Sequence, residues 1–280
     1  MSAPDITDDS GLPVVERPLS AWQRLSGVTA LRRGLILVLL AVVWELYARW
    51  LDSPLMIPTF TDTLDAFRDA VVSGRLPSMA GTSLRVLLMG YALGVLLAAV
   101  LAGLASASRW GDDLLATLVA MFNPLPAIAL LPMAMLWFGL GTPSILFVLV
   151  HAVLWPLALN THAGFMGVSE TLRMVGRNSG LGGLRFIAAI LIPAAFPAIL
   201  TGLKVGWAFA WRTLIAAELV YGAASRSGGL GWFIFENKNR LETASVFAGL
   251  ATVILIGLLV EALIFRTIER HTVCKWGMQR

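Results

Sequence analysis

Long apolar runs separated by short charged stretches dominate the chain. No Asp, Glu, Lys or Arg occurs from Leu114 to Ser169, or from Phe186 to Leu203. A helix needs about 20 mainly apolar residues to cross the hydrocarbon core of a bilayer, and runs of this kind recur along the chain. The pattern predicts six membrane-spanning helices, at residues 34–51, 80–107, 114–138, 143–166, 192–219 and 245–265. The expected fold class is therefore an all-α polytopic membrane protein.

The segments around the first span are polar and mixed. Residues 1–33 hold acidic residues and three prolines, so we interpret them as an N-terminal tail without a long helix. No small-residue cleavage site follows the first apolar run, so we interpret that run as a retained span rather than a signal peptide. After it, Leu64, Phe67 and Val71 recur at helical spacing, with charged residues on the opposite face. This spacing predicts a short helix on the membrane surface.

Three prolines interrupt the third predicted span, at positions 124, 126 and 132. Proline removes a backbone donor and bends or breaks a helix, and in a membrane the freed backbone groups need partners or a wet cavity. Two interpretations stay open: this span lines a translocation path, or it is a kinked packing helix. If the span lines a translocation path, Pro126 and Pro132 are pathway candidates. In the second span, Gly90, Gly94 and Gly103 predict close helix packing.

A polar island at Gly167–Pro197 separates two of the apolar runs. Its Arg173, Arg177 and Arg185 place it on the cytoplasmic side, because cytoplasmic loops are enriched in Lys and Arg. Residues 172–179 have the spacing of a short helix, and the glycine at position 180 follows where it would end. The island is interpreted either as a docking helix for a soluble partner or as an ordinary positively charged loop.

The distribution of Lys and Arg predicts that both termini are cytoplasmic. Twelve of these residues fall on the proposed inner side and six on the proposed outer side. Residues 220–243 are then predicted to be an outer loop and residues 266–280 a basic inner tail, of which residues 271–280 lie beyond the membrane domain. The orientation is supported by a two-to-one bias.

Composition excludes several classes of protein. Apolar residues make up 58% of the chain and charged residues 14%, which is unlike a soluble domain. The net charge of +4 is too small and scattered to indicate nucleic-acid binding. The only cysteine, Cys274, permits no disulfide within one chain. No lysine stands in the Gly-Lys-Ser/Thr context of a phosphate-binding loop, so any ATP would be hydrolysed by another subunit.

Ionisable residues within the predicted spans are candidates for function, because isolated charges are costly in lipid. Arg212 and the adjacent Trp211 are pathway candidates, and Arg212 either lines a path for an anion or pairs with Glu218 or Glu261. Glu218 itself is a candidate for gating or for a structural role. His151 and His162 lie on one face of their span. They would bind a metal only with carboxylates from other helices; otherwise they are expected to make interhelical hydrogen bonds.

The island resembles the EAA loop of bacterial ABC importer permeases, whose pattern is E-A-A-x3-G-x9-I-x-L-P. Gly180, Ile190 and Pro193 match the pattern, with Ile192 at the Leu position. The E-A-A triplet is replaced by Met174, Val175 and Gly176. Segments similar to permeases of the nitrate, taurine and alkanesulfonate type are Asn123–Pro126 with Leu136–Gly139, Pro193–Pro197 with Ala217–Glu218, and Gly228–Gly231.

This resemblance, which covers about residues 80–270, implies the MetI-like transmembrane domain of type I ABC importers, within a membrane domain at 34–270. It implies a coupling loop at 167–192 that docks to an ATPase. The coupling residues would be Glu170, Leu172, Arg173, Met174, Val175, Gly176, Arg177, Ser179 and Gly180. It also implies an ABC ATPase pair, a periplasmic solute-binding protein, a second permease copy and no cofactor. The solute would be a small anion such as a sulfonate or nitrate. The alternative is a self-sufficient membrane channel or intramembrane enzyme.

Overall fold

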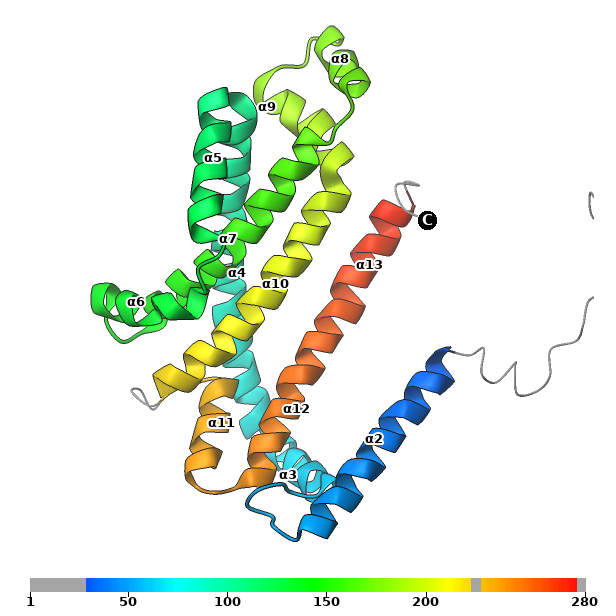
Figure 1. The fold of residues 1–280 in the computed structure, drawn as a ribbon, viewed down its shortest axis with the longest axis vertical. Helices are drawn as coiled ribbons and strands as arrows, with labels where there is room; N and C mark the ends of the chain where they lie inside the picture. The colour runs from blue at the N-terminus through cyan, green and yellow to red at the C-terminus, as the bar shows by residue number, and fades with distance from the viewer. Residues whose placement is uncertain (1–28, 223–227, 276–280) are drawn as a thin grey trace, which may run out of the picture.

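The computed structural model of the chain describes residues 29–222 and 228–275. Within these ranges every regular element is a helix (Figure 1). Five stretches are long and apolar enough to cross a membrane, and a sixth span results if one bent helix pair is counted as a single crossing. The predicted all-α polytopic fold is confirmed. Residues 1–28 of the predicted N-terminal tail, and residues 276–280 of the C-terminal tail, lie outside the described residues.

The predicted spans correspond to helices that in several cases are longer than expected. They are α2 (Thr29–Leu51), α4 (Arg75–Ala107), α5 (Arg109–Phe122) with α6 (Leu131–Phe138), α7 (Thr142–Met166), α10 (Ile192–Gly222) and α12 (Thr243–Leu259). Helical structure begins before α10. The short helix α9 (Gly183–Phe186) and the π-helical turn η2 (Ile187–Leu191) lead directly into it.

The last span also continues beyond its predicted end at residue 265. The helix runs on through η3 (Val260–Phe265), α13 (Arg266–Glu269) and η4 (Arg270–Cys274). The Lys204 ammonium on α10 lies 2.7 Å from the carboxylate of Glu269 and 3.9 Å from that of Glu261. These ion pairs hold a charged helical turn against α10, which is why the helix does not stop where the apolar run ends.

The third predicted span is not one continuous helix. Residues 109–122 and 127–138 are bent by 85° at the proline-containing break, where the 3-10 turn η1 (Ala127–Leu130) precedes α6. Pro124 and Pro126 remove two backbone donors at this point, so the helix cannot continue through it. The chain turns between α4 and α5 at Ser108, and Arg109, Asp112 and Asp113 lie in the first turns of α5. The Ser108 hydroxyl accepts from the Gly111 amide at 3.0 Å and caps α5, so that α5 starts directly after α4.

The core is built around α7, which packs between α4 and α10. A Cβ atom at Gly90 would lie 2.6 Å from the Leu149 Cβ, and one at Gly94 would lie 2.7 Å from the Val153 Cβ. These two glycines therefore permit the close approach of α4 and α7 predicted for them. The same prediction is wrong for Gly103, because in the described chain no side chain and no other helix comes within 4 Å of its Cβ position.

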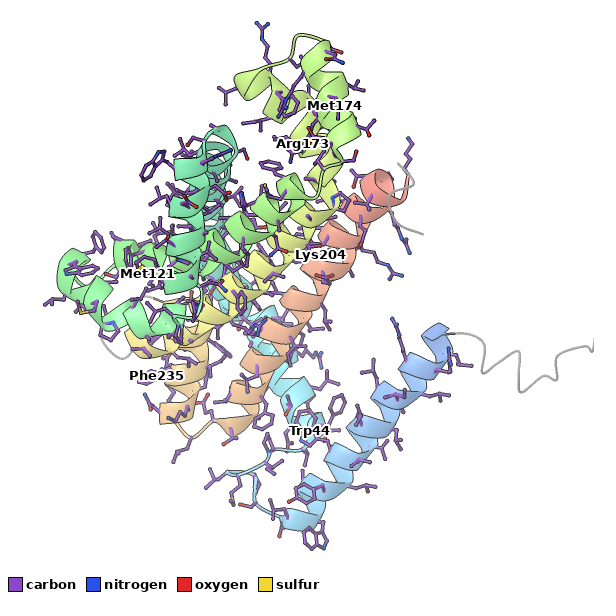
Figure 2. The ribbon with its side chains drawn as sticks, turned by 45° about the horizontal axis from the view of Figure 1, so that its top comes forward. Trp44, Met121, Arg173, Met174, Lys204 and Phe235 are labelled. Carbon is purple, nitrogen blue, oxygen red and sulfur yellow. The ribbon has the colours of Figure 1, made fainter. Side chains whose placement is uncertain are left out.

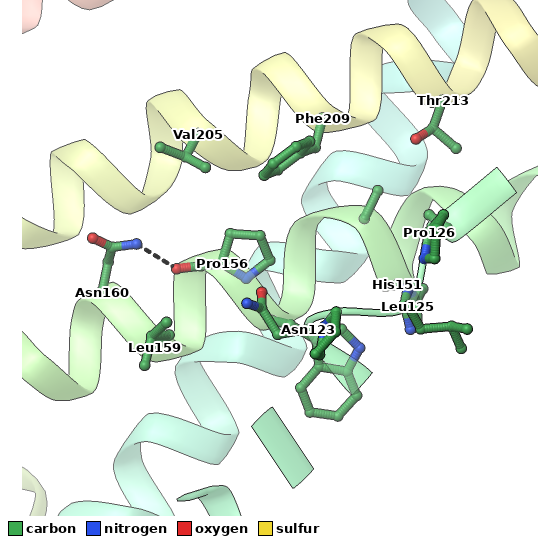
Figure 3. Close-up of a pocket in the computed structure, with 14 residues that line it drawn as sticks. Asn123, Leu125, Pro126, His151, Pro156, Leu159, Asn160, Val205, Phe209 and Thr213 are labelled. Carbon is green, nitrogen blue, oxygen red and sulfur yellow. Dashed lines mark hydrogen bonds between the residues drawn. The ribbon is translucent and has the colours of Figure 1, made fainter. Parts of the chain in front are cut away.

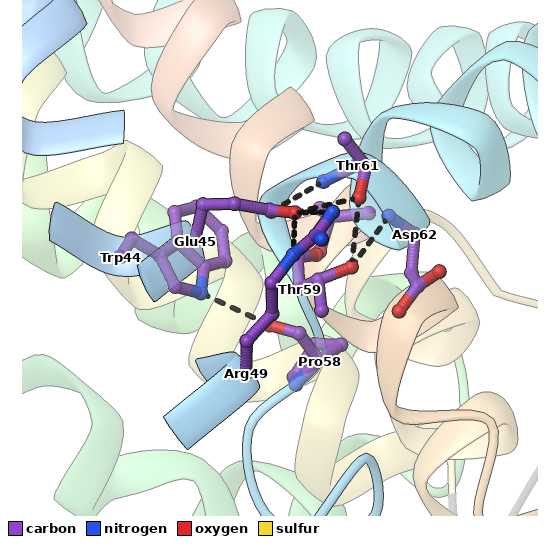
Figure 4. Close-up of polar contacts among 8 residues, drawn as sticks. Trp44, Glu45, Arg49, Pro58, Thr59, Thr61 and Asp62 are labelled. Atoms are coloured by element: carbon purple, nitrogen blue, oxygen red, sulfur yellow. Dashed lines mark hydrogen bonds and ion pairs between the residues drawn. The ribbon is translucent and has the colours of Figure 1, made fainter. Parts of the chain in front are cut away.

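At the end of the molecule opposite α8 (Glu170–Asn178), α2 is fastened to the surface helix α3 (Phe60–Val72), which the sequence predicts (Figures 1 and 4). The Trp44 indole donates to the Pro58 carbonyl at 3.0 Å. The Glu45 carboxylate accepts from the Thr61 backbone amide at 3.2 Å. Along most of its length α2 stands apart from α12 and α13 (Figures 1 and 2), and its apolar side chains are exposed as a membrane-spanning helix requires.

Candidate functional site

The short helix α8 at the tip of the molecule has defined ends. Its first turn is capped by the Ser169 hydroxyl, which accepts from the Leu172 amide at 3.4 Å. At its C-terminal end the Gly180 amide donates to the Arg177 carbonyl at 3.0 Å, and the Leu181 amide donates to the Gly176 carbonyl at 3.1 Å. Gly180 has a φ of +74°. This is the Schellman arrangement, in which glycine takes the left-handed position, and the predicted helix end is confirmed.

Two of the nine coupling candidates attach α8 to its own chain. The Arg173 guanidinium donates to the Val168 carbonyl at 3.1 Å and to the Phe165 carbonyl at 2.5 Å, at the end of α7. Gly176 is buried, and a Cβ atom there would lie 2.9 Å from side-chain atoms of Phe186 and Ile190. In the EAA pattern, this position is an Ala of the E-A-A triplet. Glycine stands here because α8 packs too closely on α9 and η2 for a side chain.

The other coupling candidates face outward. Leu172, Met174 and Val175 are exposed to 37%, 52% and 55% of their surface, although they are apolar. Glu170 and Arg177 form an exposed ion pair at 4.0 Å, and Ser179 and Gly180 are exposed as well. Figure 2 shows Met174 at this tip and Arg173 beside it. A small helix that carries exposed apolar side chains on a rigid base is suited to binding another protein.

A cavity of about 440 Å³ lies where the broken span meets α7 and α10 (Figure 3). Asn123 and Pro126 contribute from the break, His151 and Trp155 from α7, and Thr213 from α10, as part of the lining. Pro126 is thus placed at a cavity, as the pathway interpretation expects. Pro132 lies at the start of α6 and is not among the lining residues.

Arg212 lies beside this cavity and has no acidic partner among the residues that the structure describes. Its Nε donates to the Ala208 carbonyl of its own helix at 3.0 Å, and its guanidinium carbon lies 5.2 Å from the centre of the Phe209 ring, which lines the cavity. In the described part of the chain no carboxylate lies within 4 Å of the guanidinium. The interpretation that Arg212 pairs with Glu218 or Glu261 is therefore wrong. Trp211 is buried, away from the cavity, and donates to the Val253 carbonyl at 3.2 Å.

The two histidines of α7 differ in their surroundings. The His162 Nε2 lies 3.0 Å from the Asp112 carboxylate, which is the interhelical contact the sequence suggests. The His151 Nε2 is buried and has no hydrogen-bond partner among the described residues. Within residues 29–222 and 228–275, no group of three potential metal ligands comes together, so His151 and His162 do not assemble a metal site there.

Glu218 belongs to a buried polar network at the end of the bundle opposite α8 (Figure 1). Its carboxyl group accepts from the Ser83 hydroxyl at 2.8 Å and from the Gly231 amide at 2.9 Å. The Ser83 oxygen in turn accepts from the Leu230 amide at 2.8 Å. The network joins α4 and α10 to the N-terminus of α11 (Leu230–Asn239), where an acidic group is favourable. Glu218 therefore has the structural role considered for it.

Sequence reasoning missed α11, since residues 220–243 are predicted to be a loop. The helix buries Leu230, Phe233, Ile234 and Asn237 against the bundle. The three- and four-residue spacing of these positions is the signal that identifies such a helix. The side chain of Arg75, on α4, forms an ion pair with Glu236 of α11 and fixes its outer surface.

Comparison with known proteins gives consistent matches. Residues 90–270 match the model of the family described as the binding-protein-dependent transport system inner membrane component. The chain is 31% identical over 261 residues to the taurine transport system permease protein of Escherichia coli, with 88% of this chain and 90% of that protein covered. It is 30% identical over 227 residues to a putative ABC transporter permease of Methanocaldococcus jannaschii, with 80% and 84% covered. It is 28% identical over 241 residues to the nitrate import permease of a Synechocystis species, with 84% and 86% covered. The resemblance stated from the motifs is confirmed.

Proposed function

The chain belongs to the family of binding-protein-dependent transport system inner membrane components, and on that premise we propose that it is the permease subunit of an ATP-binding-cassette importer. Two copies would form the path. A pair of ATPase subunits would bind α8 on the cytoplasmic side, and a periplasmic solute-binding protein would deliver the solute from the other side. Both termini would be cytoplasmic, which agrees with the excess of Lys and Arg on that side.

The observation that carries this proposal is the construction of α8. Its exposed Leu172, Met174 and Val175 provide an apolar surface for the ATPase. Arg173 and Gly176 bind its other face to the end of α7 and to η2. The ATPase would hold one face of α8, and the chain itself holds the other. A displacement imposed by ATP-driven closure of the ATPase pair would therefore be transmitted to α7 and α10 as a rigid-body motion.

That motion would act on the cavity, because α7 and α10 form two of its three walls. The third wall is the break after α5, where Pro126 prevents a regular helix that would resist rearrangement. In this scheme Pro126 and Arg212 lie along the path. Pro132 sets the start of α6, while Trp211 and Glu218 hold α10 to α12 and α11 during the motion.

The proposed solute is a small anion such as a sulfonate or nitrate. The names of relatives support this class, since they include taurine, aliphatic sulfonate and nitrate permeases. Arg212 also supports it, because it has no acidic partner in the described ranges, and such a cation inside a membrane protein favours an anionic solute. The solute-binding protein would choose among such anions.

The test is co-purification of the tagged chain from its host in mild detergent, with mass spectrometry of the bound proteins. We expect an ABC ATPase subunit in about one-to-one ratio. Met174→Asp should abolish this association, because it places a charge on the apolar docking surface. Val72→Asp, at an exposed position of α3 at the far end of the molecule, is the matched control and should retain it.

Recovery of the wild-type chain alone, also under conditions that trap ATP, would contradict the importer and favour the channel or enzyme alternative. Retention of the ATPase by Met174→Asp at wild-type levels would contradict the assignment of α8 as the docking surface.

A further inference from the structure

A second cavity, of about 850 Å³, lies at the α8 end of the molecule, where Arg173 is labelled in Figure 2. We call it the α4–α8 groove, because the last turns of α4 line it together with the end of α7 and the residues from α8 to η2. Phe165 of α7 and Leu191 of η2 form its apolar base and are 4% and 3% exposed. The exposed apolar side chains of α8 do not line this groove, so the proposed docking of an ATPase does not account for it.

The α4 part of the lining lies at the end of an apolar run. No Asp, Glu, Lys or Arg occurs from Val86 to Ser108, and Arg109 follows. Val100 and Leu104 line the groove and are 51% and 54% exposed. Gly103 lines it as well, and in the described chain no side chain and no other helix comes within 4 Å of its Cβ position. Because the first charges mark the edge of the hydrocarbon region, this part of the groove lies just inside the membrane, next to the headgroups.

The α8 part of the lining carries positive charge. Arg173 and Arg177 are one helical turn apart on the same face of α8, and no Asp or Glu belongs to the described lining. The hydrogen bonds of the Arg173 guanidinium in the described chain go to backbone carbonyls, which do not neutralise its charge. The contact of Arg177 with Glu170 is exposed and 4.0 Å long, and such a pair contributes little. The groove therefore presents two cations beside an apolar surface.

We infer that the α4–α8 groove binds one anionic phospholipid, with its phosphate at the two arginines and an acyl chain along the surface of α4 around Gly103. A ligand with a negative headgroup and a hydrocarbon tail matches both parts of the lining, and basic pockets at the cytoplasmic ends of membrane helices attract such headgroups. That the lipid comes from the cytoplasmic leaflet rests on the proposed function, which places α8 on that side. The bound lipid would lie between α4 and α8 and strengthen the attachment of α8 to the bundle.

The test compares phosphatidylglycerol, which is anionic, with phosphatidylcholine, which has no net charge, at equal mole fraction in detergent with the full-length chain. At a concentration of phosphatidylglycerol tenfold above its Kd, the melting temperature should be about 3 °C higher than with phosphatidylcholine. Arg177→Gln should reduce this difference by about half or more. Arg185→Gln removes the same charge from α9, at a position outside the lining, and is the matched control that should keep most of the difference.

A second pair of variants tests the part of the groove assigned to the acyl chain. The space at the Cβ position of Gly103 is open, so Gly103→Leu should fold, and its side chain should occupy the groove. The difference in melting temperature between the two lipids should again fall by about half or more. Gly81→Leu, at an equally open position near the other end of α4, is the matched control and should keep the full difference.

Equal melting temperatures of the wild-type chain in the two lipids would overturn the site and leave a protein surface, of the ATPase or of a second copy, as the occupant. Equal losses in Arg177→Gln and Arg185→Gln would reduce the effect to a general attraction between surface charge and anionic lipid, and a full difference in Gly103→Leu would exclude the groove.

Sodium phosphate, which has no acyl chain, should give no rise against sodium chloride at equal ionic strength. A rise as large as that with phosphatidylglycerol would identify a site for soluble phosphate and overturn the lipid assignment. These measurements need no ATPase, so their failure is distinct from failure of the proposed function. An ATPase that co-purifies while the two lipids give equal melting temperatures would leave the importer standing and remove this site.

Discussion

Replacing Glu218 by alanine should destabilise the end of the bundle opposite α8. The carboxyl group is 6% exposed and is the acceptor for the Ser83 hydroxyl and the Gly231 amide. The substitution leaves both donors buried without their partner. An unsatisfied buried donor costs about 1–3 kcal/mol. The Ser83 hydroxyl is free to rotate toward a carbonyl of its own helix. Most of the loss in unfolding free energy therefore comes from the Gly231 amide.

The expected loss is therefore about 2–4 kcal/mol of unfolding free energy. In a chain of this size it corresponds to a decrease in melting temperature of roughly 5–10 °C. Glu218→Gln keeps one carbonyl oxygen but brings an amide donor toward the Gly231 amide, so its decrease should be intermediate. The assay is the apparent melting temperature of the detergent-purified chain, followed by intrinsic fluorescence.

The matched control is Thr82→Ala, which removes the neighbouring hydroxyl on α4. Thr82 is exposed and donates only to the Ser78 carbonyl of its own helix, at 3.2 Å. Its melting temperature should change by less than about 2 °C. If Glu218→Ala melts together with this control, the network does not fasten α11, and the reasoning is refuted.

Substitutions at three further positions test the α8 end of the molecule and the proposed path. Gly176→Leu forces a side chain against Phe186, so we expect a loss of ATPase co-purification; a wild-type yield of ATPase would argue against close seating of α8. Gly180→Val strains the left-handed turn by at least about 1–2 kcal/mol, and uptake per ATP hydrolysed should fall, whereas unchanged uptake would show that the turn is dispensable. Arg212→Gln removes the charge and should reduce the rate of anion uptake about tenfold or more, which corresponds to an increase of about 1.4 kcal/mol in the barrier. Arg212→Lys keeps the charge and should reduce uptake much less. Equal uptake by the two Arg212 variants would exclude a role for the charge.

The membrane spans could be predicted from the sequence because hydropathy is a local property. The end of α8 at Gly180 was predictable for the same reason, since a glycine after a short helical repeat has few other uses. The prolines of the third span predicted a bend or break, which the structure places at residues 123–126. They did not give its 85° bend, which depends on how α6 packs against α7.

Long-range contacts account for the errors. The replacement of a triplet alanine by Gly176 has no explanation in the sequence, because the close approach of Phe186 comes from the fold. The helix α11 was missed because its N-terminus is completed by Glu218 and by Ser83, which is distant in sequence. The supposed pairing of Arg212 with Glu218 was avoidable. Six residues on a helix correspond to a rotation of about 240°, which places the two side chains on different faces.

The most direct test of the importer function is solute uptake by proteoliposomes that contain the chain with its co-purified ATPase, supplied with the solute-binding protein loaded with the small anion that it binds. We predict accumulation of this anion only when ATP is present on the side of the membrane to which α8 is exposed. We also predict that Met174→Asp, which removes the docking surface, abolishes this accumulation. Flux of the anion through the chain without ATPase or ATP would contradict the importer and identify a self-sufficient channel.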